Sequence, residues 1–222
     1  RRAFPDFAVE AAEVSREIGK PVKVIWSRED DTRHDFYRPS TYNELRGGID
    51  DQGNIKAWEH KLVAPSMAKS ILPVMGALAP QWIPDWMISA VIKGAGFLLE
   101  SSDPTTSEGS VEMPYKIENI DVRHIFHDPG IPLGPWRSVG HSQNAFITES
   151  FIDELANLAG QDPYQFRRRL LREHQDYLKV LDLVAEKSKW GNAGQGLYQG
   201  IAIHKSFGTI VSQVVDLELV ND

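Results

Sequence analysis

Apolar residues recur at helical spacing near the start of the chain and again over its second half. The pattern over 6–18 predicts a helix that ends at Gly19. Beyond Asn144 an apolar stripe predicts a long helix, and in "QDPYQFRRRLLREH" Asp162 is expected to be the N-cap of another. A third helix is expected over 175–187. The pattern therefore gathers helices in the second half of the chain.

Alternating apolar and polar residues predict strands elsewhere. "PVKVIWS" is expected to be a strand, and "YNELRGGID" with "NIKAWEHKLVAP" a hairpin around the turn at 51–53. "YKIENIDVRHIFHD" resumes the alternation, and "LYQGIAIHKSFG" and "TIVSQVVDLELV" predict two closing strands. Residues 66–109 are rich in Pro, Gly and Trp without a clean period, which predicts irregular structure with short helices and a mobile loop. The predicted fold class is α+β, with antiparallel or mixed sheet pieces packed against helices.

The chain of 222 residues is long enough to bury a substantial core. We expect 1–222 to be part of one domain of a longer subunit. Residues 1–130 would form its strand-rich part, and residues 131–222 a loop, three helices and the closing strands. The sequence opens on two arginines without a methionine and stops as a predicted strand finishes, which we interpret as the two ends of an internal fragment.

Charge and composition exclude several classes of function. A net charge of −7 disfavours nucleic acid as a partner, and the run Arg167-Arg168-Arg169 is interpreted as a solvated helical face. The absence of cysteine excludes disulfides, zinc–cysteine sites and iron–sulfur ligands within this sequence. No apolar run approaches the roughly 20 residues of a membrane helix, and no signal peptide is visible, so the cellular location is left open.

Two constellations of reactive side chains are weak candidates for chemistry. Ser138, His141 and Asp153 contain the residue types of a hydrolase triad, but one turn leading into a helix does not suit its linear geometry. His124 and His127 suggest a metal, yet residues three apart in a strand point to opposite faces. We therefore expect neither a hydrolase nor a metal ligated by these histidines.

The stretch "GPWRSVGHSQNAF" is the stronger candidate. A loop that feeds a helix presents free backbone N–H groups at a positive dipole end, which suits an anionic or oxo-bearing ligand. Arg137 would add a charged donor fork, and Trp136 an apolar wall with one donor. Ser142 or Asn144 is expected to cap the helix. The alternative is a purely structural loop in which Trp136 fills the core and Arg137 pairs with an acid.

Three stretches together resemble a known family. They are "RSVGHSQNAFITESFIDELA", "GKPVKVIWSREDDTRHDFYRP" and "GIAIHKSFGTIVSQVVDLEL". They are similar to the large, molybdopterin-binding subunit of molybdenum hydroxylases, the xanthine dehydrogenase and aldehyde oxidase superfamily, and most to the β-subunits of its isoquinoline 1-oxidoreductase branch. "WRSVGHSQNAF" followed by "ESFIDELA" carries most of this resemblance.

The resemblance implies an oxidoreductase with a molybdenum–molybdopterin cofactor. Its substrate would be an aldehyde or an N-heteroaromatic ring of the isoquinoline type, and water would supply the oxygen. Electrons would leave through [2Fe–2S] clusters on a small iron–sulfur partner subunit. The cofactor carries the chemistry, so the role of the protein is positioning and electrostatics. Related proteins are often exported, so the resemblance favours a periplasmic location.

The resemblance also assigns residues. The expected cofactor-binding residues are Arg1, Arg2, Trp136, Arg137 and Ser138. Val139 falls where the family lines its substrate channel, and no residue of this sequence is expected to ligate the metal. Ser138 replaces the copper-binding cysteine of the carbon monoxide dehydrogenase branch, which disfavours carbon monoxide oxidation. The glutamate base of the family is expected beyond Asp222, so no catalytic residue is assigned.

A second hypothesis belongs to another class of protein. The chain would be a cofactor-free binding or scaffolding domain that keeps the loop only as a helix cap. If the chain is a truncated piece, its missing strands should leave sheet edges and apolar patches exposed, and the fragment is expected to self-associate.

Overall fold

The computed structural model describes residues 6–80 and 82–220. Arg1 and Arg2 lie outside these ranges, so their predicted role stays a prediction. The chain divides into two units. Unit 1 comprises Arg1–Ser40, Ala64–Thr106 and Ile125–Trp136, and unit 2 comprises Thr41–Val63, Ser107–His124 and Arg137–Asp222. None of the described helices combines the length and the apolar character that crossing a membrane requires.

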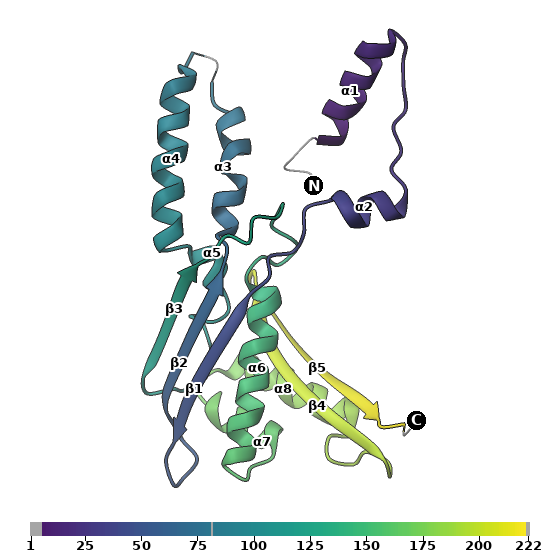
Figure 1. The fold of residues 1–222 in the computed structure, drawn as a ribbon. Coiled ribbons are helices and arrows are strands. Elements are labelled where there is room, and N and C mark those ends of the chain that lie inside the picture. Colours follow the sequence, from purple (N-terminus) through teal and green to yellow (C-terminus); the bar gives the residue numbers. More distant parts are fainter. Residues whose placement is uncertain (1–5, 81, 221–222) are drawn as a thin grey trace. The chain divides into compact units, whose positions relative to one another are not determined.

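Among the described residues, four helices lie in unit 1 (Figure 1): α1 Asp6–Ile18, α2 Arg28–His34, α3 Met67–Ala77 and α4 Asp85–Ser101. The short α5 Pro104–Ser107 begins in unit 1, and its last residue belongs to unit 2. α1 has the predicted bounds and is followed by Gly19 at φ +64. The strand predicted from "PVKVIWS" is wrong, because this segment has no strand pairing in the described structure and runs as a connection into α2. A capping box between Ser27 and Asp30 starts α2, a helix that the hydrophobic pattern did not predict.

Residues 66–109 are mainly helical, which corrects the irregular structure expected there. The N-cap Ser66 accepts a hydrogen bond from the Lys69 N–H, and α3 and α4 then pack against each other as a hairpin. The two helices approach closely at Gly76, where a Cβ atom would overlap the side chain of Ile92. The apolar residues of this hairpin surround the helices without a single stripe, so the sequence showed no helical period.

Unit 2 carries the strands and the three predicted helices. One sheet has the order β1-β2-β3, and β4 and β5 form a separate antiparallel hairpin. The bounds are β1 Tyr42–Ile49, β2 Ile55–Ala64, β3 Ile120–Phe126, α6 His141–Leu158, α7 Pro163–Leu170, α8 Gln175–Ser188, β4 Leu197–Ser206 and β5 Thr209–Glu218. The first hairpin, α8 and the two closing strands are confirmed, and the Asp162 carboxylate caps α7 as predicted.

The core of unit 2 lies among α6, α7, α8 and both sheets. Its fully buried side chains come from distant parts of the chain: Trp58, Ile152, Phe166, Leu171, Leu181 and Ile203. α6 is central because one of its faces meets β1 at Gly47, where a Cβ atom would lie 3.0 Å from Phe151 and Leu155. The β1–β2 turn is held from α7 by Arg169, which donates to the carbonyls of Gln52 and Gly53. Unit 2 therefore places α6 beside the β4–β5 hairpin (Figure 1).

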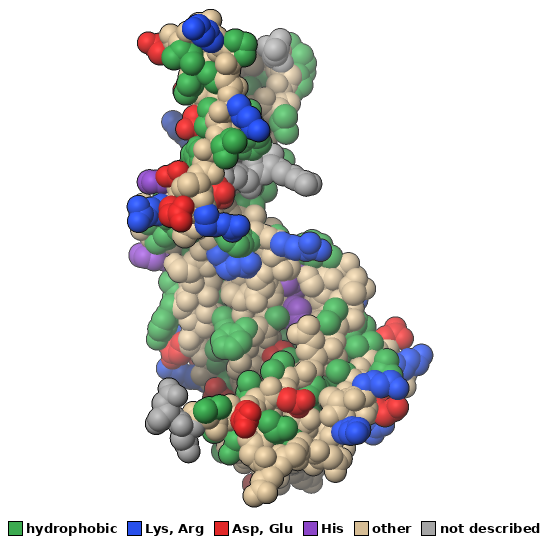
Figure 2. Space-filling view, turned by 90° about the vertical axis from the view of Figure 1, so that its right-hand side faces the viewer, with side chains coloured by type: hydrophobic (Ala, Val, Ile, Leu, Met, Phe, Trp, Pro, Cys, Tyr) green, Lys and Arg blue, Asp and Glu red, His purple; other side chains and the backbone are tan. Residues whose placement is uncertain are grey.

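Hydrophobic side chains reach the surface of unit 2 on the β4–β5 hairpin. Val211, Val215 and Leu217 of β5 are each about half exposed. Figure 2 views the side of the molecule on which the β4–β5 hairpin lies in Figure 1, and it shows hydrophobic side chains among polar ones there. Within the described residues this sheet has only two strands. The exposed apolar positions expected from the sequence are thus present, while self-association stays a prediction.

Candidate functional site

The turn that precedes α6 has a strained backbone. Ser138 and Val139 have φ values of +66° and +45°, the left-handed region that residues with a Cβ atom rarely adopt. Two consecutive residues of this kind cost of order 1–3 kcal/mol each, and such strain clusters at binding and active sites. For the β-branched Val139 the conformation is especially unfavourable. The surrounding contacts must therefore hold this turn in place.

α6 begins earlier than predicted and without a side-chain cap. Its first residue is His141 and its N-cap is Gly140, so the expected capping by Ser142 or Asn144 is wrong. The Ser142 hydroxyl instead donates to the Arg137 carbonyl at 3.0 Å. The amide of Asn144 donates to the Glu108 carbonyl at 2.8 Å, because this residue lies within the first helical turn and points inward.

The serine hydroxyls bond within the turn itself. The Ser138 hydroxyl donates to the Arg137 carbonyl at 2.6 Å, and its oxygen lies 2.8 Å from that of Ser142. His141 bonds to His204, and Asp153 bonds to Arg167. Ser138, His141 and Asp153, the residue types of a hydrolase triad, therefore bond to other residues and not to one another.

Trp136 and Arg137 are both exposed. The Trp136 side chain is 50% exposed, its indole N–H donates to the Phe36 carbonyl at 3.1 Å, and the Arg38 guanidinium lies 5.1 Å from its ring centroid. The indole donor is thus already used within unit 1. Arg137 forms no ion pair with any residue in the described ranges. The structural alternative, with Trp136 in the core and Arg137 paired to an acid, is therefore wrong.

A pair of histidines lies directly behind the turn. His141 Nδ1 is 3.0 Å from His204 Nε2 on β4, and the two ring centroids are 5.2 Å apart. Burial, followed by the charge of His141, lowers the pKa of His204. Gly109, at φ +82°, lies against both rings, because a Cβ atom there would be 2.9 Å from His204 Cε1 and 3.0 Å from His141 Nδ1.

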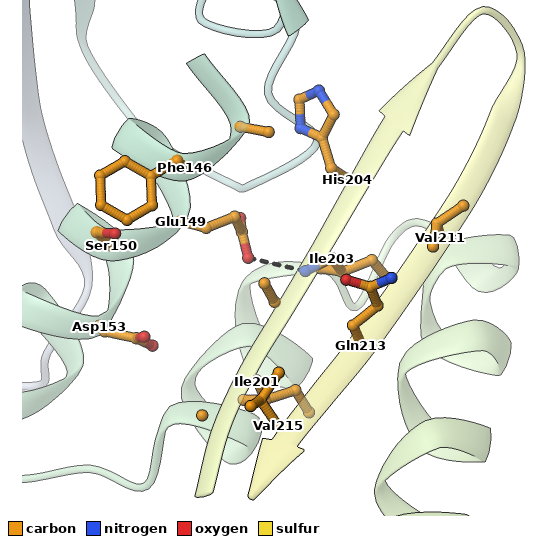
Figure 3. A pocket seen from close by; sticks show the side chains of 13 residues that line it. Phe146, Glu149, Ser150, Asp153, Ile201, Ile203, His204, Val211, Gln213 and Val215 are labelled. Carbon is orange, nitrogen blue, oxygen red and sulfur yellow. Dashed lines mark hydrogen bonds between the residues drawn. The ribbon is translucent and has the colours of Figure 1, made fainter. Parts of the chain in front are cut away.

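A pocket of about 490 Å³ opens between α6 and the β4–β5 hairpin. Figure 3 shows Phe146, Glu149 and Ser150 on the α6 side, and Ile203, His204, Val211 and Gln213 on the hairpin side. Its volume is in the range of small-molecule sites, and its lining is mostly apolar with a few polar groups.

The Glu149 carboxylate is fixed at the inner end of this pocket. It accepts hydrogen bonds from the Tyr115 hydroxyl at 2.6 Å and from Arg167 Nε at 3.0 Å. It also accepts one from the Ile203 N–H at 2.9 Å, the dashed line in Figure 3. Burial raises the pKa of Glu149, and the charge of Arg167 opposes that rise. Burial alone would lower the pKa of Arg167, but Glu149, Tyr115 and Asp153 raise it. The arginine therefore stays charged, and the network joins α6, α7 and β4.

The interpretation of Arg167-Arg168-Arg169 as a solvated face is wrong for two of the three. Arg167 is fully buried, and Arg169 is bound to the β1–β2 turn. Only Arg168 fits the prediction, with its side chain 49% exposed and bonded to Asp182. No local signal distinguishes Arg167 from the other two arginines, because all three are basic residues of one short helix.

Sequence reasoning also missed two other features of this region. One is His204, whose partner is 63 positions away in the chain. The other is Gln143, whose amide oxygen and nitrogen are both buried and have no hydrogen-bond partner among the described residues. The described residues contain no group of three or more His, Asp or Glu side chains arranged to hold a metal ion.

Comparisons with known proteins match part of this chain to one family. Residues 87–171, which include the strained turn, match the family described as a molybdopterin cofactor-binding domain. The chain is 29% identical over 207 residues to the beta subunit of isoquinoline 1-oxidoreductase of Brevundimonas diminuta, covering 91% of this chain and 24% of that one. It is 26% identical to a subunit of nicotinate dehydrogenase of Pseudomonas putida, covering 86% of this chain and 14% of that one.

Solved structures share the fold. Quinoline 2-oxidoreductase from Pseudomonas putida 86 matches with a TM-score of 0.55 and 20% identity, over 86% of this chain and 24% of that one. Aldehyde oxidoreductase from Desulfovibrio gigas matches with a TM-score of 0.54 and 16% identity, over 86% of this chain and 20% of that one. The chain thus spans about a quarter or less of the length of these relatives.

Proposed function

We propose that this chain forms part of the large subunit of a molybdenum hydroxylase, because residues 87–171 match the molybdopterin cofactor-binding family and the similar proteins are subunits of such enzymes. The reaction would be the oxidation of an aldehyde or an N-heteroaromatic ring, with water as the oxygen source. When bound, the molybdenum centre supplies the two-electron oxidation of a carbon–hydrogen bond. The names of the relatives, which include isoquinoline and nicotinate, favour an N-heteroaromatic substrate.

The strained turn at Ser138 and Val139 is the observation that carries this proposal. It leads into an 18-residue helix without a side-chain cap, and the positive dipole end of such a helix suits an anionic or oxo-bearing group. Arg137 adds an exposed guanidinium that has no ion pair among the described residues. The buried, unpartnered amide of Gln143 offers a donor and an acceptor to a polar ring. These groups fit an anionic, polar organic cofactor.

The proposal assigns a role to each of these residues. Trp136, Arg137 and Ser138 would hold the cofactor, Arg137 through its guanidinium and Ser138 through backbone N–H groups of the turn. The side chain of Val139 would face the substrate. The glutamate base that the resemblance implies would come from another part of the large subunit. Electrons would pass to [2Fe–2S] clusters of a small partner subunit.

The test replaces Arg137 by alanine in the complete polypeptide and measures molybdenum bound per polypeptide. A hydrogen bond to a charged group contributes about 1.5–3 kcal/mol, so the cofactor should bind at least about tenfold more weakly. Arg172→Ala, which removes an exposed arginine just beyond the end of α7, is the control and should keep the wild-type content. Full molybdenum content and turnover in Arg137→Ala would refute the proposed role. A wild-type protein that folds without any molybdenum would favour the scaffolding alternative instead.

A further inference from the structure

The strained turn needs contacts that hold it from behind, and its own hydrogen bonds are few. Within the turn, the Ser138 and Ser142 hydroxyls bond to the Arg137 carbonyl. Both bonds are local and lie on the exposed or half-buried side. They join residues at most five positions apart in the chain, so they do not fix the turn relative to the rest of unit 2.

The contact that does so is the pair of histidines. His141 is the first residue of α6 and follows the strained residues after one glycine, and it is only 8% exposed. Its partner His204 belongs to β4, whose neighbouring residue Ile203 is part of the buried core. The bond between Nδ1 of His141 and Nε2 of His204 therefore connects the end of the turn to a rigid strand.

A second segment, around Gly109, packs against this pair of histidines. The backbone at Gly109 lies against both imidazoles, with no room for a Cβ atom. The neighbouring carbonyl, that of Glu108, accepts the amide N–H of Asn144 one turn further along α6. The first turn of α6 is thus held at His141 and at Asn144 by two elements that are distant in sequence.

We propose that His204 is a positioning residue, which holds the Ser138–Val139 turn in its strained conformation through a single hydrogen bond to His141. The proposal rests on the proposed function, because it assigns to this pair the task of presenting the turn to the cofactor. One imidazole donates and the other accepts, so the geometry requires a polar atom at the Nε2 position of residue 204 and at the Nδ1 position of residue 141.

Amide side chains test this requirement atom by atom. A glutamine amide extends to the position of an imidazole Nε2, whereas an asparagine amide extends only to the position of Nδ1. His204→Gln and His141→Asn should therefore keep the bond, and His204→Asn and His141→Gln should lose it. A general loss of packing would not produce this pattern, in which Gln is tolerated only at position 204 and Asn only at position 141.

The readout is tryptic cleavage of the Arg137–Ser138 bond in the complete polypeptide, purified without molybdenum and followed by mass spectrometry. Loss of one hydrogen bond corresponds to about fivefold more frequent opening, so His204→Asn and His141→Gln should be cleaved about five times faster than wild type. His204→Gln and His141→Asn should stay within about twofold. His60→Asn is the matched control, because His60 is also buried and bonds through Nε2, but to Asn43 on β1, and its loss should leave this cleavage unchanged.

Equal cleavage of the Asn and Gln variants at both positions would overturn the proposal, as would an equal acceleration in His60→Asn. If one pair of variants does not fold, the other pair tests the same bond from its other end. Molybdenum content, measured in parallel after growth with molybdate, should fall in His204→Asn and be retained in His204→Gln. A wild type that never contains molybdenum would refute the proposed function, while the cleavage pattern would still decide the role of the pair.

Discussion

Replacing Arg167 by methionine is expected to destabilise the protein more than any exposed substitution on the same helix. Its guanidinium is fully buried and donates to the Glu149 carboxylate, to the Glu149 carbonyl and to the Pro163 carbonyl, and it pairs with Asp153. Methionine fills much of the same volume but leaves Glu149 buried with only two neutral donors, the Tyr115 hydroxyl and a backbone N–H. Removing one partner of a buried ion pair costs about 3–5 kcal/mol.

The assay is urea unfolding of the complete polypeptide, with Arg168→Met as the matched control. Arg168 is the next residue, and its side chain is half exposed, so its loss should cost less than about 1 kcal/mol. The double variant Arg167→Met/Glu149→Leu removes both charges, and it should cost less than the sum of the two single variants by about 2 kcal/mol or more. If Arg167→Met costs no more than Arg168→Met, or if the two single effects simply add, the buried network does not stabilise the fold in this way.

Three further predictions follow from other positions. Burial lowers the pKa of His60 from 6.5 to about 4. The neutral imidazole therefore contributes about 3 kcal/mol to the free energy of unfolding above pH 6.5, and this contribution is lost as the pH falls towards 4. The difference in unfolding free energy between wild type and His60→Gln should shrink over that interval, and a constant difference would contradict the prediction. Val139→Gly relieves the left-handed strain, so it should stay within about 1 kcal/mol of wild type, whereas Val63→Gly at a half-buried strand position should cost about 2 kcal/mol or more. The isolated chain should self-associate in size-exclusion chromatography, because Val211 and Val215 on β5 are about half exposed, and a monomer at all concentrations would argue against this.

Local patterns predicted the elements whose partners lie nearby in sequence. The β1–β2 hairpin follows from alternation on both sides of a glycine turn, and α7 follows from Asp162 before a proline. The segment 21–27 has the same alternation, but a strand also needs a neighbour to pair with, and none is present in the described structure. α3 and α4 were missed for the opposite reason, since helices that are apolar on all sides show no period.

The same distinction between local patterns and distant contacts applies to the candidate site. The loop before α6 was predicted as a binding candidate from its residue types, and the structure places two consecutive left-handed residues in it. Its supports could not be predicted, because His204 and Gly109 reach His141 from positions 63 and 32 residues away, and single-sequence patterns contain no information about such contacts. The burial of Arg167 was hidden by charge, since a basic run is usually a solvated face.

The bonds from Arg169 to the β1–β2 turn join groups 116 and 117 positions apart. The hairpin pairs neighbours in sequence, so we expect it to close early during folding, and we expect these long-range bonds to form later, when α7 docks. Contacts that form after the transition state affect the rate of unfolding more than the rate of folding. We therefore expect loss of the Arg169 side chain to speed the opening of the native state and to change the folding rate little.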